Sequence, residues 1–261
     1  MPFEHAMQAS RFELKYIIDE ERAHGVRNFV RDYLEPDEHA NPDEKDWAYP
    51  VFSLYIDNPA LMLYRQTVHG LKNRFKLRIR FYDGNPETPA FLEIKRRVTD
   101  VICKERAAVS REGVECLLDG GWPGPSYLFG KKSGSMAAIS ALENFRSLYT
   151  SIGAGPAVYV CYMREAYVSP NSNQVRVTFD RELFGARFDR SQCLIPPLDG
   201  ARPDVGGVIL ELKFTDRFPP WMRDLVQAFN LQRGSMPKYV DCIDTMGIRP
   251  GQGFHLEAGM A

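Results

Sequence analysis

The sequence predicts an α+β fold: a closed, antiparallel, eight-stranded β-tunnel or barrel with a charged lumen, flanked by a few helices. Three observations predict it. Eight segments alternate between apolar and polar residues, as strands with two unlike faces do. Nearly all of these segments place Arg or Lys on the polar face. Only three stretches show the apolar spacing of a helix.

Residues 74–82, RFKLRIRFY, show the strictest alternation. One face of this strand would carry four cations: Arg74, Lys76, Arg78 and Arg80. The other face would be apolar, through Phe75, Leu77, Ile79 and Phe81. Cations on one strand face lie only ~6.6–6.8 Å apart, so they repel one another. Folding alone does not need such a face, and we therefore expect it to meet an anion.

The other strand-like segments also carry charge on one face. In chain order the eight segments are 11–18, 51–57, 74–82, 90–97, 101–109, 159–168, 175–180 and 208–214. One charged face alone would be typical of a half-exposed antiparallel sheet. Because Arg or Lys recurs along so many strands, we expect these faces to point into a sheet that closes on itself. Such a lumen suits a chain of phosphates, which Arg matches with its planar fork, together with Mg²⁺ or Mn²⁺ on the carboxylates.

Helices are expected outside the sheet, at residues 19–34, 136–150 and 220–229. The first stretch places Val26, Phe29 and Val30 on one stripe and has acidic residues in its first turn. The third opens with Pro220, a residue favoured at the first position of a helix.

Composition limits the class of protein. The chain has 261 residues, 44% of them hydrophobic and 26% charged, which suits one large domain or two small ones. The net charge is −1, so a nucleic-acid-coating protein is not expected. The five cysteines are scattered and odd in number, which favours reduced thiols and a cytoplasmic location. No apolar run reaches the ~18–20 residues of a membrane span.

Five fragments in order resemble a known family: RFELKY, SLYIDNPALMLYRQTVHGLKNRFKLRIRFY, FLEIKRR, RVTFD and ILELKF. They are similar to the catalytic domain of the vacuolar transporter chaperone (VTC) family, the polyphosphate polymerases. That family belongs to the triphosphate tunnel metalloenzymes, together with CYTH-type triphosphatases and adenylate cyclases. The resemblance implies a single domain over residues 1–261, with its core at about 11–239, and a tunnel of eight antiparallel strands.

The resemblance also implies the site residues. Phosphate would be bound by Lys15, Arg78, Arg80, Lys95, Lys104, Arg164, Arg176, Lys213 and Lys238. Of these, Arg78, Arg80 and Lys238 would be catalytic, with Lys238 near the tunnel mouth, and Glu211 would bind the metal.

Two positions depart from the family pattern. The wider superfamily has an E-x-E-x-K strand, and here Arg11 replaces the first Glu, which favours the VTC branch over the hydrolytic CYTH branch. Pro237 stands where a Ser usually precedes the Lys of an SKY-type motif. The SPX and membrane domains of eukaryotic VTC catalytic subunits are absent, so a separate membrane partner could collect the product.

The expected function is that of a metal-dependent phosphotransferase, which moves the γ-phosphoryl of ATP to a growing inorganic polyphosphate chain and uses Mn²⁺ or Mg²⁺. One alternative keeps the fold but makes the protein a tripolyphosphatase or nucleoside triphosphatase. Another alternative is a non-catalytic protein that binds polyanions or RNA. The positions of Phe75 and Phe81, opposite the cations, argue against base stacking and therefore against RNA. A chain-length assay with ATP or tripolyphosphate separates the two enzymatic alternatives.

Overall fold

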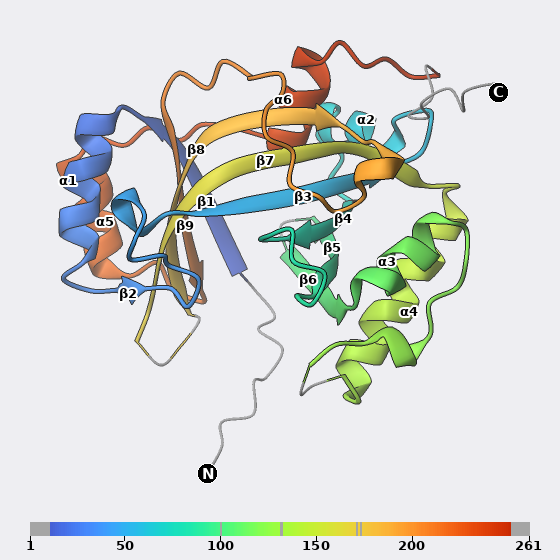
Figure 1. Ribbon diagram of the computed structural model, residues 1–261. Helices are drawn as coiled ribbons and strands as arrows, with labels where there is room; N and C mark the ends of the chain where they lie inside the picture. The colour runs from blue at the N-terminus through green and yellow to red at the C-terminus, as the bar shows by residue number, and fades with distance from the viewer. Residues whose placement is uncertain (1–10, 100, 131–132, 171, 173, 252–261) are drawn as a thin grey trace.

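The computed structural model describes residues 11–99, 101–130, 133–170, 172 and 174–251. They form one antiparallel sheet in the order β1-β9-β8-β7-β3-β4-β5-β6, with α1, α3, α4 and α5 on its outside (Figure 1). The strands of this path are β1 (Arg11–Ile18), β3 (Tyr49–Asp57), β4 (Arg74–Phe81), β5 (Ala90–Val98), β6 (Val101–Val109), β7 (Gly155–Val168), β8 (Val175–Arg187) and β9 (Val208–Thr215). A short strand, β2 (Glu35–Pro36), pairs with β7. The eight predicted strands are therefore confirmed.

The alternation on β4 separates core from charge as predicted. Leu77, Ile79 and Phe81 are fully buried in the core that lies outside the curved sheet, and Phe75 packs against the same core. Arg78 faces the other way and pairs with Glu93 of β5. The inner face of the sheet is thus the charged one.

The predicted closed barrel is not confirmed, because the sheet is open between β1 and β6. These strands end the hydrogen-bonded order, and among the described residues no backbone pairing joins them. They nevertheless lie side by side, and Lys95 of β5 forms an ion pair of 2.9 Å with Glu13 of β1. Long charged side chains, and not a backbone ladder, therefore bridge this edge. Charged side chains are a common means of keeping sheet edges from pairing.

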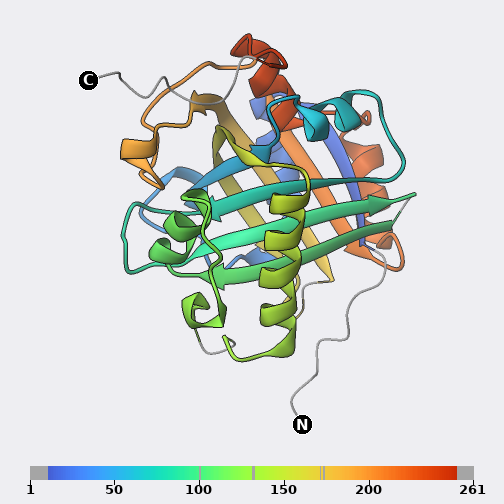
Figure 2. The same cartoon turned by 90° about the vertical axis from the view of Figure 1, so that its right-hand side faces the viewer.

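Helices cover the two outer flanks of the sheet. α1 (Glu20–Val30) and α5 (Pro220–Ala228) pack on the side of β1, β8 and β9 (Figure 1). α3 (Arg111–Leu118) and α4 (Met136–Ser151) cover the side of β5 and β6 (Figure 2). The three predicted helices are confirmed, with Asp19 and Ser135 as side-chain N-caps of α1 and α4.

A buried ion pair fastens α1 to the outer face of the sheet. Arg27 of α1 donates two hydrogen bonds to the carboxylate of Glu165 on β7, at 2.5 and 2.9 Å. Arg181 of β8 donates to the same carboxylate at 3.0 Å, and so does the hydroxyl of Tyr167. Since Glu165 is 1% exposed, this cluster holds helix and sheet in one arrangement.

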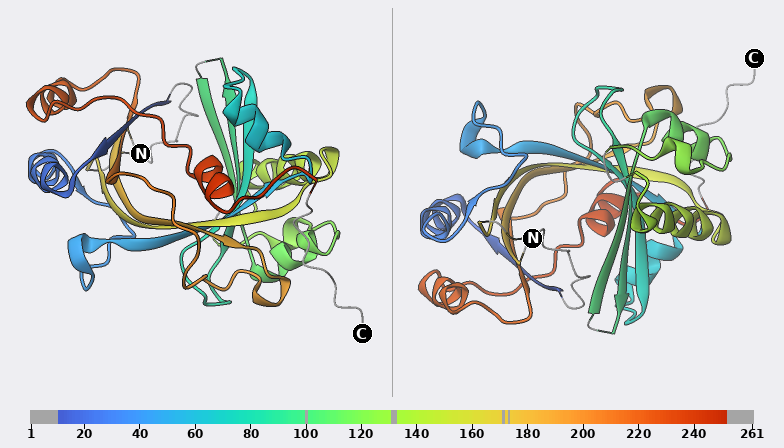
Figure 3. Two further views of the ribbon diagram at one scale, coloured as in Figure 1. Left: turned by 90° about the horizontal axis from the view of Figure 1, so that it is seen from above. Right: turned by 90° about the horizontal axis from the view of Figure 1, so that it is seen from below.

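Three short helices were not predicted: α2 (Met62–Val68), α3 and α6 (Lys238–Thr245). α6 matters most for the site, because it lies between the two walls of the sheet (Figure 3). It packs on the inner face of β3, β7 and β8 through Tyr239, Cys242 and Ile243. Gly185 of β8 permits this close approach, since a Cβ there would lie 2.8 Å from the Cβ of Cys242.

Candidate functional site

The inner face of the sheet brings all of the predicted phosphate-binding residues onto one surface, which we call the lumen. Strands supply all of them except Lys238, which begins α6. Most belong to one of two linked clusters, centred on the carboxylates of Glu211 and Glu93. Cations outnumber carboxylates in both clusters, but each of these cations lies beside a carboxylate, so the lumen is a network of ion pairs and not a bare row of cations.

Glu211 of β9 is the centre of the first cluster. Its Oε1 lies 3.1 Å from Nζ of Lys15 and 3.0 Å from Nζ of Lys238, and its Oε2 lies 2.6 Å from Nζ of Lys213. Burial would raise the pKa of this carboxyl, but the three lysines and Arg164 hold it well below its usual range. Glu211 is therefore an anion at any physiological pH.

Asp180 of β8 extends this cluster. Arg164 of β7 donates two hydrogen bonds of 2.7 Å to its two carboxylate oxygens, and Lys238 lies 2.7 Å from Oδ2. Burial opposes ionisation of Asp180, yet Arg164 and Lys238 lower its pKa to about 2. Lys238 is 9% exposed, and its ammonium is held between Asp180 and Glu211 in the interior of the lumen.

Glu93 of β5 centres the second cluster. Arg78 donates to its Oε2 at 2.6 Å, and Nζ of Lys104 lies 2.7 Å from its Oε1. Arg106 of β6 approaches the same Oε1 at 3.2 Å, and Arg80 approaches Oε2 at 4.0 Å. Burial lowers the pKa of Lys104 to about 7, although Glu93 opposes the shift. This lysine therefore changes its charge near neutral pH.

Neutral hydroxyls complete the environment of the two β4 arginines. Arg80 donates to the hydroxyls of Ser53 and Tyr162, each at 3.2 Å, and Arg78 donates to the hydroxyl of Tyr55 at 3.4 Å. Burial alone would raise the pKa of Tyr55, but Arg78 and neighbouring cations lower it to about 8. Neighbouring hydroxyls thus help to fix the positions of both arginines.

Arg176 lies apart from both clusters. Its guanidinium donates to the carboxylate of Asp37, which is 6% exposed, and to the hydroxyl of Tyr49 at 3.2 Å. Asp37 comes from the acidic segment after α1. Arg176 therefore lies on the predicted face of its strand, but its partner is the carboxylate of a loop residue and not one of the two cluster carboxylates.

Sequence reasoning left several lumen residues out of the site. Arg106, Tyr55, Tyr162 and Ser53 contact the predicted residues, and Asp37 comes from a segment with no strand pattern. A signal for the first four was present, because each occupies an inward position of a predicted strand. None was available for Asp37.

A divalent metal fits the lumen only in company with phosphate. Among the described residues, no three His, Cys, Asp or Glu side chains gather closely enough to hold a metal. Glu211 is a hard oxygen donor, but both of its oxygens face lysines. Mg²⁺ in proteins commonly takes one or two carboxylates and completes its shell with substrate phosphates and water. The donor set is compatible with that pattern and not with a protein-only metal site.

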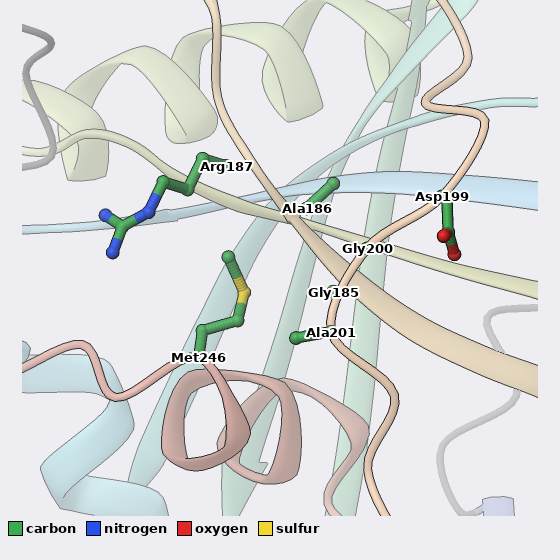
Figure 4. A pocket seen from close by; sticks show the side chains of 7 residues that line it. All are labelled: Gly185, Ala186, Arg187, Asp199, Gly200, Ala201 and Met246. Atoms are coloured by element: carbon green, nitrogen blue, oxygen red, sulfur yellow. The ribbon is translucent and has the colours of Figure 1, made fainter.

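A shallow pocket of about 310 Å³ lies outside this network. It is lined by Gly185, Ala186, Arg187, Asp199, Gly200, Ala201 and Met246 (Figure 4). Arg187 extends to the left, away from Asp199, in this view, and Met246 reaches toward the pocket from the end of α6. No predicted phosphate-binding residue lines it, so the candidate site remains the lumen.

The fold and the lumen define a class: α+β domains that line the inner face of a curved antiparallel sheet with paired cations and carboxylates. A family model described as the VTC domain matches residues 10–247. The chain belongs to the VTC domain family, as its sequence predicted.

Two solved structures are similar to this chain, each at 12% identity. A candidate adenylate cyclase from Bacillus halodurans has a TM-score of 0.47, covering 88% of this chain and 95% of that chain. The PH1819 protein from Pyrococcus horikoshii has a TM-score of 0.44, covering 89% of this chain and 97% of that chain. The search of curated proteins found no match. Within the described part of the chain, no helix has both the length and the apolar composition to cross a membrane.

Proposed function

We propose that this protein is a metal-dependent phosphotransferase of the triphosphate tunnel type, which extends inorganic polyphosphate with the γ-phosphoryl group of ATP. Membership of the VTC domain family supports the reaction class. The single observation that carries the proposal is the convergence of Arg78, Arg80, Arg164 and Lys213 of the inner sheet face with Lys238 of α6. Such a set of planar forks and point charges suits a run of phosphates.

The reaction places most of its demands on position and charge. A terminal phosphate oxygen of the chain attacks the γ-phosphorus, the bond from that phosphorus to the β-phosphate oxygen breaks, and ADP leaves. Arg78 and Arg80 would hold the transferred group, and Lys238 would hold the acceptor chain. Their carboxylate and hydroxyl partners hold them in the lumen in the ligand-free protein, and phosphate would replace some of these partners when it binds. No covalent nucleophile is required.

A metal would add to this charge. The carboxylate of Glu211 would bind Mg²⁺ or Mn²⁺, and oxygens of the bound phosphates would be further ligands. Bound there, a divalent ion would neutralise charge on the phosphates during transfer. Lys15, Lys213 and Lys238 would then turn from Glu211 toward the phosphates.

The test is incubation with ATP and Mn²⁺, followed by gel analysis of polyphosphate length. Growth of long chains by the wild type, and its loss in Arg80→Ala, is the expected result. Hydrogen bonds to charged groups contribute about 1.5–3 kcal/mol each, so this variant should also bind tripolyphosphate more weakly. Loss of added tripolyphosphate without chain growth would instead identify a triphosphatase.

The non-catalytic RNA-binding alternative receives no support from β4. Phe75 and Phe81 lie on the core side of the strand, where they cannot stack on bases. Retention of RNA on a filter at both low and high salt would speak against the phosphotransferase.

A further inference from the structure

The four cations of β4 differ in their partners. Arg78 and Arg80, in the second half of the strand, share the carboxylate of Glu93. Within the described residues, no carboxylate lies in ion-pairing distance of Arg74 or Lys76, in the first half. Arg74 donates to the backbone carbonyl of Leu71, at 2.5 Å. One strand face thus has a half whose cations contact a carboxylate and a half whose cations contact none among the described residues.

The surroundings of Lys76 are mainly cationic. It is paired in register with Lys95 on β5, whose ammonium already binds Glu13. Tyr55 of β3, Lys15 of β1 and Arg74 also face it. Burial lowers the pKa of Lys76 to about 8, and Lys95, Lys15 and Arg74 add to the shift, although Tyr55 opposes it.

One anionic group faces Lys76 from α6. Burial raises the pKa of Asp241, although Lys15 and Lys76 lower it electrostatically. Asp241 forms no ion pair with either lysine, and its Oδ2 is buried without a hydrogen-bond partner. Lys76 is therefore a partly buried cation whose neighbours do not neutralise it. Partly buried charges are normally paired, so a bound anion would supply the partner that this lysine lacks among the described residues.

The spacing along β4 indicates which anion would reach it. Residues two apart on a strand lie ~6.6–6.8 Å apart, so Lys76 lies about 7 Å beyond Arg78 and about 13 Å beyond Arg80. A triphosphate bound by Arg78 and Arg80 is short enough to stay within the half of the strand that Glu93 pairs. A longer chain continues along the same face to Lys76 and then to Arg74.

We infer that Arg74 and Lys76 form a separate subsite, which binds the phosphates of a long inorganic polyphosphate chain and not those of a triphosphate. The inference rests on the proposed function for the class of ligand. It goes further by assigning chain-length selectivity to two residues outside the triphosphate site. Binding at this subsite gains a charge-assisted contact without breaking an ion pair, unlike binding at Arg78 or Lys238.

Equilibrium binding without ATP or metal tests the subsite. Affinities for tripolyphosphate and for long-chain polyphosphate are compared in the wild type, Lys76→Gln and Arg223→Gln. The control removes the same charge from an exposed position of α5, on the outer side of the sheet. We expect Lys76→Gln to weaken long-chain binding by about tenfold and tripolyphosphate binding by less than twofold, a size typical of one lost charged hydrogen bond.

Two further variants sharpen the result. Lys76→Arg keeps the charge and should keep the preference for long chains, whereas Arg74→Gln should weaken long-chain binding alone. Equal weakening of both ligands by Lys76→Gln would place Lys76 in the triphosphate site and overturn the inference. So would affinities that match those of Arg223→Gln. Because no turnover is measured, failure of polymer synthesis would overturn the proposed function and leave this result standing.

Discussion

At the scale of single residues, the main question is what Glu211 does. Three lysines lie within 3.1 Å of its carboxylate, so it balances charge in the ligand-free protein. A metal ligand would have the same surroundings before phosphate binds. Removing the charge while keeping the shape of the side chain separates the two roles.

We predict that Glu211→Gln lowers turnover by at least ~10²-fold at saturating Mn²⁺, because a metal's charge stabilisation is worth several kcal/mol. Binding of metal-free tripolyphosphate should persist or tighten, since a negative charge has left the site. The measurement is turnover against Mn²⁺ concentration. Glu13→Gln is the matched control, because Glu13 also neutralises lumen lysines, at 3.5 Å from Lys15 and 2.9 Å from Lys95. Equal losses of turnover in the two variants would show that Glu211 only balances the charge of the lysines and does not bind the metal.

At the scale of elements, β4, β5 and β6 carry a row of lysines in register: Lys76, Lys95 and Lys104. The pKa of Lys104 is lowered to about 7 and that of Lys76 to about 8. Raising the pH from about 6.5 to about 9 therefore removes positive charge from the lumen. We predict that loss of the Lys104 charge lowers the affinity for tripolyphosphate over this range, as measured by calorimetry, whereas loss of the Lys76 charge affects only longer chains. Lys104→Arg should flatten the profile, because a guanidinium stays protonated. An affinity independent of pH would contradict the prediction.

The stability of the ligand-free protein should respond to pH in the opposite direction. The pKa of Lys104 in the folded protein, about 7, lies below its usual value of 10.5, so the unfolded chain binds more protons between these values. The free energy of unfolding then rises with pH. Because this lysine is 44% exposed, the change should be small.

The attachment of α1 is the second feature at this scale. Removing one partner of a buried ion pair typically costs about 3–5 kcal/mol, because the remaining charge is left unpaired. We predict a loss of this size for Glu165→Ala in urea unfolding, with tripolyphosphate affinity unchanged, since the cluster lies on the outer face. Asp46 stays 2.8 Å from Arg27 and limits the loss. A change below about 1 kcal/mol would show that Asp46 replaces Glu165 fully.

At the scale of the whole molecule, the lumen links stability to ligand. A ligand that binds only the folded state stabilises it by about 2.7 kcal/mol at one hundred times its dissociation constant. For a chain of this size that corresponds to a Tm rise of roughly 5–10 °C. We predict such a rise with tripolyphosphate or polyphosphate, shrinking in high salt. Potassium chloride at equal ionic strength is the control. No rise with any polyanion would refute a polyanion-binding lumen.

Most of the sheet could be predicted from the sequence, because each strand alternates locally and strongly. The same alternation placed Lys15, Arg78, Lys95 and Lys213 on one inner surface. The openness of the sheet could not be predicted, since it depends on how the first and last strands meet in space. Nor could the sharing of Glu93 by cations of two strands, which depends on register.

The short helices escaped prediction for a different reason. α2 has seven residues, too few for a periodic apolar stripe, and the side chain of Asp57 before it accepts from the backbone N–H groups of Leu63 and Tyr64. α6 begins at Lys238, directly after Pro237, and is held in place by tertiary packing on β3, β7 and β8. Helical stability of this kind comes from contacts that local sequence does not encode.

The open edge between β1 and β6 has a consequence for how a polymer enters. A polymer can enter a barrel that is closed by backbone hydrogen bonds only with one of its ends first. Here the two edge regions of the sheet are joined by ion pairs between side chains, such as Glu13 with Lys95. Phosphate would compete with Glu13 for Lys95. Breaking these ion pairs leaves the strand ladders intact. A long chain would then be laid in sideways at an internal stretch, and its two ends would stay outside on either side.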